Sequence, residues 1–462
     1  MSLDRRRLAR QNTHTYVIGQ PGTGKTRAIE SWAMQDILAG RGVGVIDPHG
    51  DLFQHLLARL ASKPRVWERV AIINPLDPIW TVGINPLSKT PGTPSERTAG
   101  YMLDVILKVW NLSSTGTPRM TRLLSNTFLA LTQLGLSLID LPRILTDKPW
   151  REGNLGRIRS RGVKGYFQYE FPRTPAAIHQ WVTPVLNKIG PFLFDPDIQP
   201  MLKGKPTFSY RELLDTKRVL LVNVPKGILG EGTTSLMAAF IVAQIQQAAL
   251  SRTDSQNRPP FHLYLDEFQH YTTDNITDVL AEARKYSLSL TLAHQYLDQL
   301  SPQIKRAVLN TSGRLVSFRV GYQDGYRIAK EIFSRPDVLA KKRKSYRIRP
   351  GAYLPRLSVK EKVDKQGWES LALELASLRQ REFWMRHRLS PKAVKQHTFH
   401  MPTPKLTKEL RTSIVEMVET SGQRFGRLKH GPENRAGVPG EGEPKEGKDE
   451  IHPPSNIPFW HR

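Results

Sequence analysis

Short apolar runs alternate with stretches of helical apolar spacing in the first ninety residues of the chain. The runs at 15–18, 43–47 and 70–74 are each four or five residues long and rich in β-branched side chains. Strands that alternate with helices in this way predict a parallel sheet with helices on both faces. A helix is expected to begin near Lys25, directly after the first run.

The pattern changes between residues 94 and 210. Apolar positions there recur at helical spacing, most clearly in 100–112 and 120–138, and this spacing predicts an all-α insertion. Within it, residues 143–165 carry seven Lys or Arg against two acids.

Strand-like runs then return, and they predict the second half of the sheet, at 218–224, 261–265, 289–293, 314–320 and 382–386. Residues 341–365 hold ten Lys or Arg against two acids and are interpreted as a basic surface excursion. One more helix is expected at 406–420, and the Gly-, Pro- and Glu-rich chain from 431 onward is expected to be disordered. The predicted organisation is an α/β RecA-like core over 1–93 and 211–404, the insertion over 94–210, and a C-terminal helix and tail over 405–462.

Composition narrows the possible partners and compartment. The 462 residues carry a formal net charge of +26, which indicates a polyanionic partner, nucleic acid first and an acidic membrane surface second. A generally basic proteome is the alternative explanation. The chain has no cysteine, which excludes disulfides, zinc-thiolate sites and cysteine nucleophiles and fits a reducing compartment.

Neither a secretory signal nor a membrane span is expected. The most apolar stretch, 236–250, is interrupted by Gln244, Gln246 and Gln247 and is too short to cross a bilayer. It is interpreted as a buried amphipathic helix. We therefore expect a cytoplasmic protein, with membrane association only through a partner.

The strongest motif is a phosphate loop that matches GxxxxGK[ST] in full. It comprises Gly19, Gln20, Pro21, Gly22, Thr23, Gly24, Lys25 and Thr26. Such a loop turns backbone N–H groups toward the β-phosphate, and the following helix adds its positive end. Lys25 is expected to reach the β- and γ-phosphates, and the Thr26 hydroxyl to bind Mg²⁺. A chance Gly-rich turn is the alternative interpretation.

The run 261–267 ends in two carboxylates, Asp266 and Glu267. We expect Asp266 to hold Mg²⁺ and Glu267 to orient or deprotonate the attacking water, because hydrolysis needs a base beside the γ-phosphate. An acidic helix cap is the alternative. Asp47 ends another strand and is followed by His49, but a lone His predicts a turn residue rather than a metal site.

Gln295 follows the run 289–293 and lies at the tip of the predicted strand. An amide there can sense the γ-phosphate, because ligands bind at this end of open α/β sheets. A simple helix cap is again the alternative. Arg284 precedes the same strand and, taken by itself, is an ordinary surface charge.

Together these motifs resemble the FtsK–HerA superfamily of ring-forming DNA-pumping ATPases, and most of all the motor part of TraG/TraD-type conjugative coupling proteins. The resemblance rests on residues 19–26, 42–52, 84–87, 263–268 and 283–300, with a weaker likeness at 310–324. It implies that Gln295 is the sensor glutamine and that Arg284 extends into the neighbouring subunit's nucleotide. It also implies a homo-hexamer around DNA that uses ATP and Mg²⁺.

The resemblance leaves three functions open. The first is an ATP-driven DNA translocase in conjugative or type IV secretion-like transfer, with relaxase or secretion-channel partners. The second is a HerA-like ATPase that acts with a nuclease in DNA processing or defence. The third is a nucleotide-gated recruitment module that pumps nothing. A motor that moves protein substrates, for which the basic charge would be incidental, is a further alternative. The chain departs from coupling proteins because it has no predicted transmembrane helices, and from HerA because little sequence precedes its phosphate loop.

Overall fold

The structure is a computed structural model, and it describes residues 13–89, 92–112, 115–272, 276–333, 365–388, 390 and 392–429. The chain divides into two compact units, residues 1–31 with 290–401 and residues 32–289 with 402–462. The described strands are mostly parallel, as the α/β prediction required. Residues 341–364 of the predicted basic excursion at 341–365, and the predicted disordered tail from 431, lie outside the described residues.

The first unit holds five strands in the order β10-β9-β8-β1-β7. They are β1 (Thr15–Ile18), β7 (Leu288–His294), β8 (Arg314–Ser317), β9 (Glu382–His387) and β10 (Val394–His397). β1 runs parallel to both β7 and β8, with Ile18 level with His294 on one side and Ser317 on the other. β9 and β10 are antiparallel additions. Consequently the phosphate loop leaves the middle of three parallel strands.

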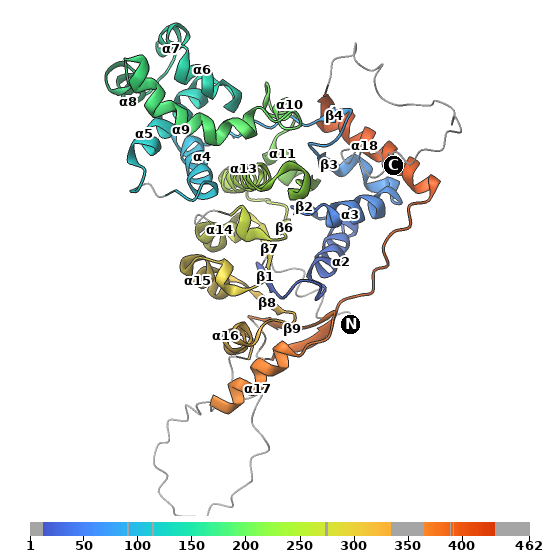
Figure 1. The fold of residues 1–462 in the computed structure, drawn as a ribbon. Coiled ribbons are helices and arrows are strands. Elements are labelled where there is room, and N and C mark those ends of the chain that lie inside the picture. Colours follow the sequence, from blue (N-terminus) through green and yellow to red (C-terminus); the bar gives the residue numbers. More distant parts are fainter. Residues whose placement is uncertain are drawn as a thin grey trace, which may run out of the picture. The chain divides into compact units, whose positions relative to one another are not determined.

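Helices accompany the strands of this unit, namely α15 (Pro302–Thr311), α16 (Tyr322–Ile332) and α17 (Lys365–Ala376). α16 and α17 lie side by side near β9 (Figure 1). They approach closely because Gly325 has no side chain: a Cβ there would lie 2.9 Å from the Ala372 carbonyl oxygen.

The second unit holds four parallel strands in the order β6-β2-β5-β3. They are β2 (Gly42–Asp47), β3 (Val70–Ile73), β5 (Val219–Asn223) and β6 (Phe261–Leu265). β2, β3 and β5 are buried at every position, as strands covered on both faces should be. The two glycines of β2 make room for β6, since a Cβ at Gly42 or Gly44 would lie under 3 Å from Phe261 or Leu263.

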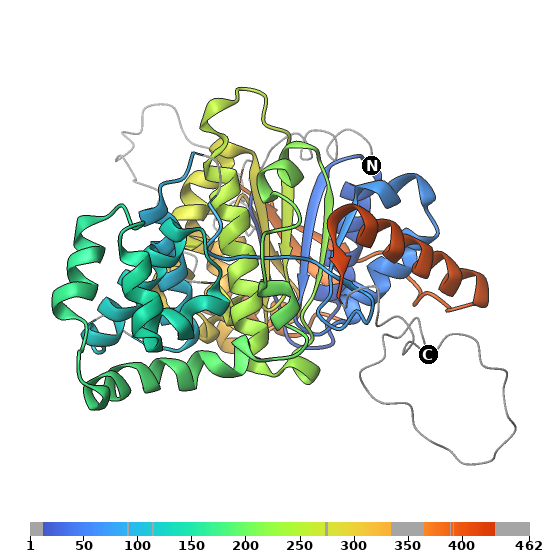
Figure 2. The ribbon, with the colours of Figure 1, turned by 90° about the horizontal axis from the view of Figure 1, so that it is seen from above.

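The region 94–210 is helical in the structure. Its longer helices are α4 (Ser95–Val109), α5 (Pro118–Leu134), α7 (Lys148–Leu155) and α9 (Pro175–Leu193), and shorter ones are α6 (Leu141–Thr146), α8 (Arg161–Gly165) and α10 (Gln199–Leu202). Figure 2 shows them gathered beside α13 (Glu231–Leu250). Phe192 of α9 packs edge-on against Phe240 of α13, with ring centroids 5.6 Å apart.

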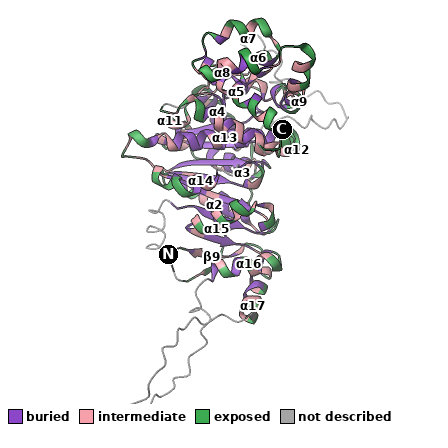
Figure 3. Cartoon of the chain, turned by 90° about the vertical axis from the view of Figure 1, so that its left-hand side faces the viewer, coloured by how far each residue is buried: buried purple, intermediate pink, exposed green. Residues whose placement is uncertain are grey.

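α13 corrects one prediction. The stretch was expected to be amphipathic, but α13 is buried on nearly every face, including Gln244, Gln246 and Gln247 (Figure 3). The Gln244 amide is accommodated because it donates a 2.8 Å hydrogen bond to the Pro86 carbonyl. By length and composition this is one helix that could cross a membrane, yet 83% of its most apolar window is buried, which is equally typical of a core helix.

The expected C-terminal helix is longer than predicted and belongs to the core of the second unit. α18 (Lys408–Phe425) packs on α3 (Asp51–Ala61) and on β3. The Ser421 hydroxyl accepts a 3.0 Å hydrogen bond from the Ile72 N–H. After it, β11 (Arg427–Leu428) pairs with β4 (Trp80–Thr81). These two short strands and β10 were not predicted from the sequence.

Candidate nucleotide-binding site

The phosphate loop connects β1 to α2 (Lys25–Leu38) in the first unit. Gly22 and Gly24 have φ values of 72° and 109°, a region that glycine reaches without steric cost. The loop is anchored at its start, because Gly19 N–H donates to the His294 carbonyl at 3.3 Å and Gln20 N–H to the Arg319 carbonyl at 2.8 Å. The loop therefore hangs between the ends of β7 and β8.

The Lys25 ammonium lies over this loop. Its Nζ is 2.6 Å from the Gly19 carbonyl oxygen and 3.2 Å from that of Gln20, and the residue is only 6% exposed. Thr23 closes the turn with a 2.7 Å hydrogen bond from its hydroxyl to the Gln20 carbonyl. A buried cation at the first turn of a helix, beside two left-handed glycines, is the arrangement that binds phosphate.

Gln295 follows β7 directly and is half-buried. Its N–H donates to Oε1 of Gln299 at 3.0 Å, and the N–H of Tyr296 donates to the same oxygen at 3.1 Å. The Gln299 amide thus holds the backbone that carries Gln295. The first unit brings Gln295 and the phosphate loop to the same ends of adjacent strands, since His294 and Gly19 are hydrogen-bonded.

A buried pair that the sequence did not predict, Tyr16 and His294, supports this arrangement. The Tyr16 hydroxyl lies 2.6 Å from His294 Nε2, and His294 Nδ1 lies 3.3 Å from Gln299 Oε1. Burial lowers the pKa of His294 to about 3, so the ring is neutral at pH 7. Burial also raises the pKa of Tyr16. The signal in the sequence was a Tyr within the predicted strand 15–18 and a His directly after the predicted strand 289–293.

Asp266 and Glu267 lie in the second unit, at the end of β6, and are 3% and 6% exposed. Glu267 has a φ of 49°, a left-handed conformation that is uncommon outside glycine and asparagine. Such a conformation is costly and is often found at functional sites. The Glu267 carboxylate accepts a 2.8 Å hydrogen bond from the Gln269 amide.

A third carboxylate belongs to the same group. Burial raises the pKa of the Tyr271 phenol, and the charges of Asp266, Asp47 and Glu267 raise it further. Asp47 itself caps the start of α3, accepting 2.9 Å hydrogen bonds from the N–H groups of His49 and Phe53. Burial raises the pKa of Asp47 despite these bonds. Both carboxylate oxygens of Asp47 are therefore engaged by backbone N–H groups at the start of α3.

Arg284 lies in the second unit on the short helix η6 (Ala283–Tyr286) and is exposed. An exposed arginine ahead of β7 is compatible with reaching another subunit, and its role stays a prediction. The roles of Lys25, Thr26, Asp266, Glu267 and Gln295 stay predictions as well. The phosphate loop and Gln295 share one unit, and the two carboxylates and Arg284 share the other.

The residues of the loop fit a nucleotide phosphate with Mg²⁺. The two left-handed glycines, the Lys25 ammonium and the half-buried Thr26 at the start of α2 are the elements required to bind one. Among the described residues no cluster of three or more His, Asp or Glu could hold another metal ion.

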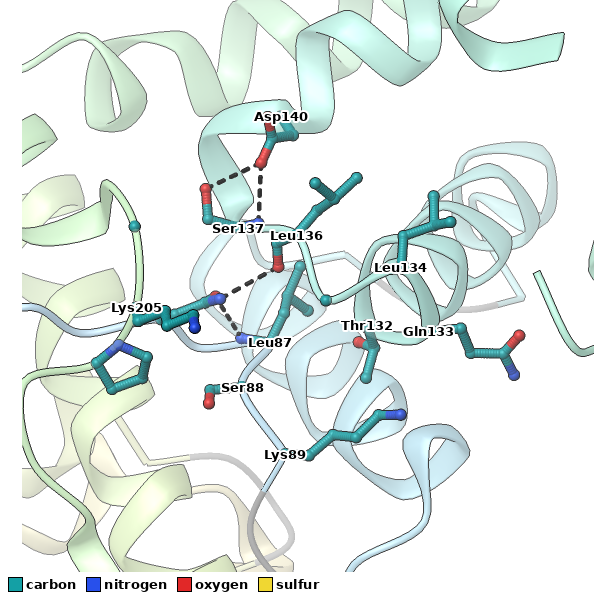
Figure 4. A pocket seen from close by; sticks show the side chains of 14 residues that line it. Leu87, Ser88, Lys89, Thr132, Gln133, Leu134, Leu136, Ser137, Asp140 and Lys205 are labelled. Carbon is teal, nitrogen blue, oxygen red and sulfur yellow. Dashed lines mark hydrogen bonds between the residues drawn. The ribbon is translucent and has the colours of Figure 1, made fainter. Parts of the chain in front are cut away.

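A separate cavity of about 520 Å³ lies in the second unit, between residues 85–89, the end of α5 and residues 204–206 (Figure 4). Asn85 is one of its lining residues, and its side chain donates to the Leu136 carbonyl at 3.1 Å and accepts from the Leu87 N–H at 3.0 Å. Its charged lining is Lys89, Lys205 and Asp140. We assign it no chemistry.

Comparisons with solved structures identify the fold. The chain resembles the plasmid coupling protein TrwB bound to a non-hydrolysable GTP analogue, with a TM-score of 0.59 and 16% identity over 86% of this chain and 88% of that one. TrwB in complex with ADP and Mg²⁺ gives a TM-score of 0.57 at the same identity and coverage. VirB4 of Thermoanaerobacter pseudethanolicus gives 0.54 at 12% identity, over 84% and 90% of the two chains. No family model and no curated protein matches the sequence.

Proposed function

We propose that this chain, which has the fold of TrwB and VirB4, is an ATPase that forms a ring and moves DNA, in conjugative or type IV secretion-like transfer. One observation carries the proposal: a complete phosphate loop between β1 and α2, with Lys25 Nζ 2.6 Å from the Gly19 carbonyl. ATP and Mg²⁺ are the proposed cofactors. The solved TrwB structures with nucleotide analogues, and with ADP and Mg²⁺, support that choice.

The chemistry follows from the charge that builds up during phosphoryl transfer. Lys25 and the loop N–H groups stabilise negative charge on the β- and γ-phosphates. Thr26 and Asp266 would hold Mg²⁺, which neutralises the phosphate oxygens when bound. Glu267 orients the attacking water and accepts its proton. Gln295 senses whether a γ-phosphate is bound. Arg284 supplies further positive charge from the adjacent subunit.

DNA as the track rests on electrostatics. A net charge of +26 favours a polyanion, and basic residues are dense in the helical region at 143–165. Phosphate contacts of this kind give binding that tolerates any sequence and weakens steeply with salt. The same proposal includes a homo-hexamer, relaxase or secretion-channel partners and a cytoplasmic location. It also includes the division of the chain into core, helical insertion and C-terminal segment.

A DNA-processing ATPase that acts with a nuclease and a recruitment module that does not pump are the competing functions. All three bind nucleotide, so binding alone does not separate them. The discriminating experiment measures steady-state ATP hydrolysis with and without DNA, followed by displacement of a labelled strand or of a bound streptavidin block. We expect DNA-stimulated hydrolysis and displacement. Hydrolysis without displacement would favour the nuclease-associated function, and neither activity would favour the recruitment module.

A further inference from the structure

Within the first unit, the turn at residues 379–381 is hydrogen-bonded to the phosphate loop. The Gln380 side-chain amide donates to the Gly22 carbonyl at 3.0 Å, and the Arg381 N–H donates to the Thr23 carbonyl at 2.8 Å. Gln380 and Gly22 are 358 positions apart in the sequence. Both bonds are accepted by carbonyls of the loop, so the turn holds the loop backbone at Gly22 and Thr23.

Arg381 holds this place at a conformational cost. Its φ is 71°, in the left-handed region, where any residue other than glycine is strained. A glycine would meet the backbone geometry and could make the same N–H hydrogen bond. The presence of arginine therefore points to a use for its side chain.

That side chain retains its positive charge. The Arg381 guanidinium lies 2.8 Å from His400 Nδ1, and it can only donate in this contact because a guanidinium has no acceptor atom. No carboxylate among the residues that the structure describes forms an ion pair with Arg381. Arg381 is exposed, and the start of its side chain lies beside Gly24, since a Cβ on Gly24 would lie 3.5 Å from Arg381 Cγ.

The position of the turn indicates which end of a nucleotide it would meet. β7, which carries Gln295 on the proposed γ-phosphate side, pairs with one edge of β1. β8 pairs with the other edge, and β9 lies beyond β8. The turn at 379–381 directly precedes β9, so it lies on the side of the loop opposite Gln295. A nucleotide whose γ-phosphate faces Gln295 presents its α-phosphate to this side.

We propose that Arg381 binds the α-phosphate of the nucleotide in the same chain's phosphate loop, and that Gln380 and the Arg381 N–H fix the loop for it. The inference rests on the proposed function, because it requires nucleotide in the loop. A guanidinium binds phosphate oxygens through charge-assisted hydrogen bonds. ATP and ADP share the α-phosphate, so Arg381 should contribute equally to the affinity for both.

The test measures the dissociation constants of Mg²⁺-ATPγS and Mg²⁺-ADP by titration calorimetry, together with the urea midpoint of each variant. Arg381→Gln should weaken both nucleotides by the same factor, about tenfold. Arg381→Gly should weaken them equally while its urea midpoint stays at or above the wild-type value, because glycine relieves the strained φ. Arg381→Lys should retain part of the affinity.

Arg379→Gln is the matched control, since Arg379 is exposed on the same turn and carries the same charge. It should bind both nucleotides as the wild type does. Wild-type affinity in Arg381→Gly, or equal losses in the two glutamine variants, would overturn the inference while leaving the proposed function intact. A wild-type protein that binds neither nucleotide would overturn both.

Discussion

The hydroxyl of Tyr16 lies 2.6 Å from Nε2 of His294, and neither side chain is exposed to solvent. Gln299 Oε1 accepts from two backbone N–H groups, which identifies this atom as the amide oxygen. An oxygen of this kind can only accept, so His294 Nδ1, which lies 3.3 Å from it, carries the proton. Nε2 is then the acceptor, and Tyr16 donates to it. This neutral pair joins the strand that enters the phosphate loop to the strand that presents Gln295.

The first prediction is a pH dependence of stability that originates in His294. Its pKa is about 3 in the folded chain and about 6.5 when unfolded. Between these values the unfolded chain binds more protons, so the free energy of unfolding falls as pH falls, by at most about 1.4 kcal/mol per pH unit. Urea midpoints at pH 7, 6 and 5 should fall less in His294→Gln than in the wild type. The exposed His179, replaced in the same way, is the control and should leave the slope unchanged.

A second prediction separates nucleotide binding from turnover. Lys25→Ala should abolish tight ATP binding, because it removes the charge over the phosphates. Glu267→Gln should bind ATP normally and hydrolyse it at least about a hundredfold more slowly, since it keeps the shape and removes the base. Steady-state phosphate release and nucleotide titration measure the two effects. Hydrolysis at the wild-type rate in Glu267→Gln would show that another group is the base.

The third prediction concerns Arg284 acting across a subunit boundary. Arg284→Ala should bind ATP yet fail to hydrolyse it, and hydrolysis by the wild type should rise more than linearly with protein concentration. Mixing Arg284→Ala with Lys25→Ala should restore activity, because some interfaces pair an intact phosphate loop with an intact Arg284. If cross-linking confirms mixed rings and they stay inactive, Arg284 does not act across the subunit boundary. Arg314 and Arg319 are then the next candidates for this role.

The fourth prediction addresses the C-terminal helix. A Cβ on Gly422 would lie 2.1 Å from Trp80 Cδ2, so Gly422→Ala should destabilise the second unit by about 1–3 kcal/mol. Gly153, on α7, has no atom within 4 Å of such a Cβ, and Gly153→Ala should instead stabilise by about 0.5–1 kcal/mol through helix propensity. Urea denaturation compares the two. Equal effects would mean that α18 can shift freely on Trp80.

The fifth prediction is electrostatic. Affinity for DNA should fall steeply with salt whatever the sequence, because binding releases counterions. Neutralising Lys341, Lys342, Arg343 and Lys344 together should flatten that slope if this segment contacts phosphate. Fluorescence anisotropy from 50 to 300 mM salt, as a rough working range, would measure it. An unchanged slope would remove these four residues from the DNA path.

Most elements could be predicted from the sequence because their signals are local. β1, β6 and the start of α2 fell where apolar runs and the glycine-rich loop indicated, since a buried strand and a phosphate loop each need particular residues at adjacent positions. The prediction that α13 is amphipathic was wrong, because α13 has no exposed polar face. A glutamine in a helix need not face solvent when a buried group accepts its hydrogen bond. The Pro86 carbonyl accepts one from the Gln244 side chain.

The sequence by itself determined that the chain carries a phosphate loop, an apolar strand ending in Asp266 and Glu267, and a strand leading to Gln295. Only the tertiary structure decided what supports the loop. Tyr16, His294 and Gln299 meet because β1 and β7 are parallel neighbours, and Gln380 and Arg381 reach the loop because β9 adds to β8. Such contacts join distant positions, and neither partner leaves a local pattern, because a hydrogen bond constrains the distance between two atoms and not the spacing of residues along a chain.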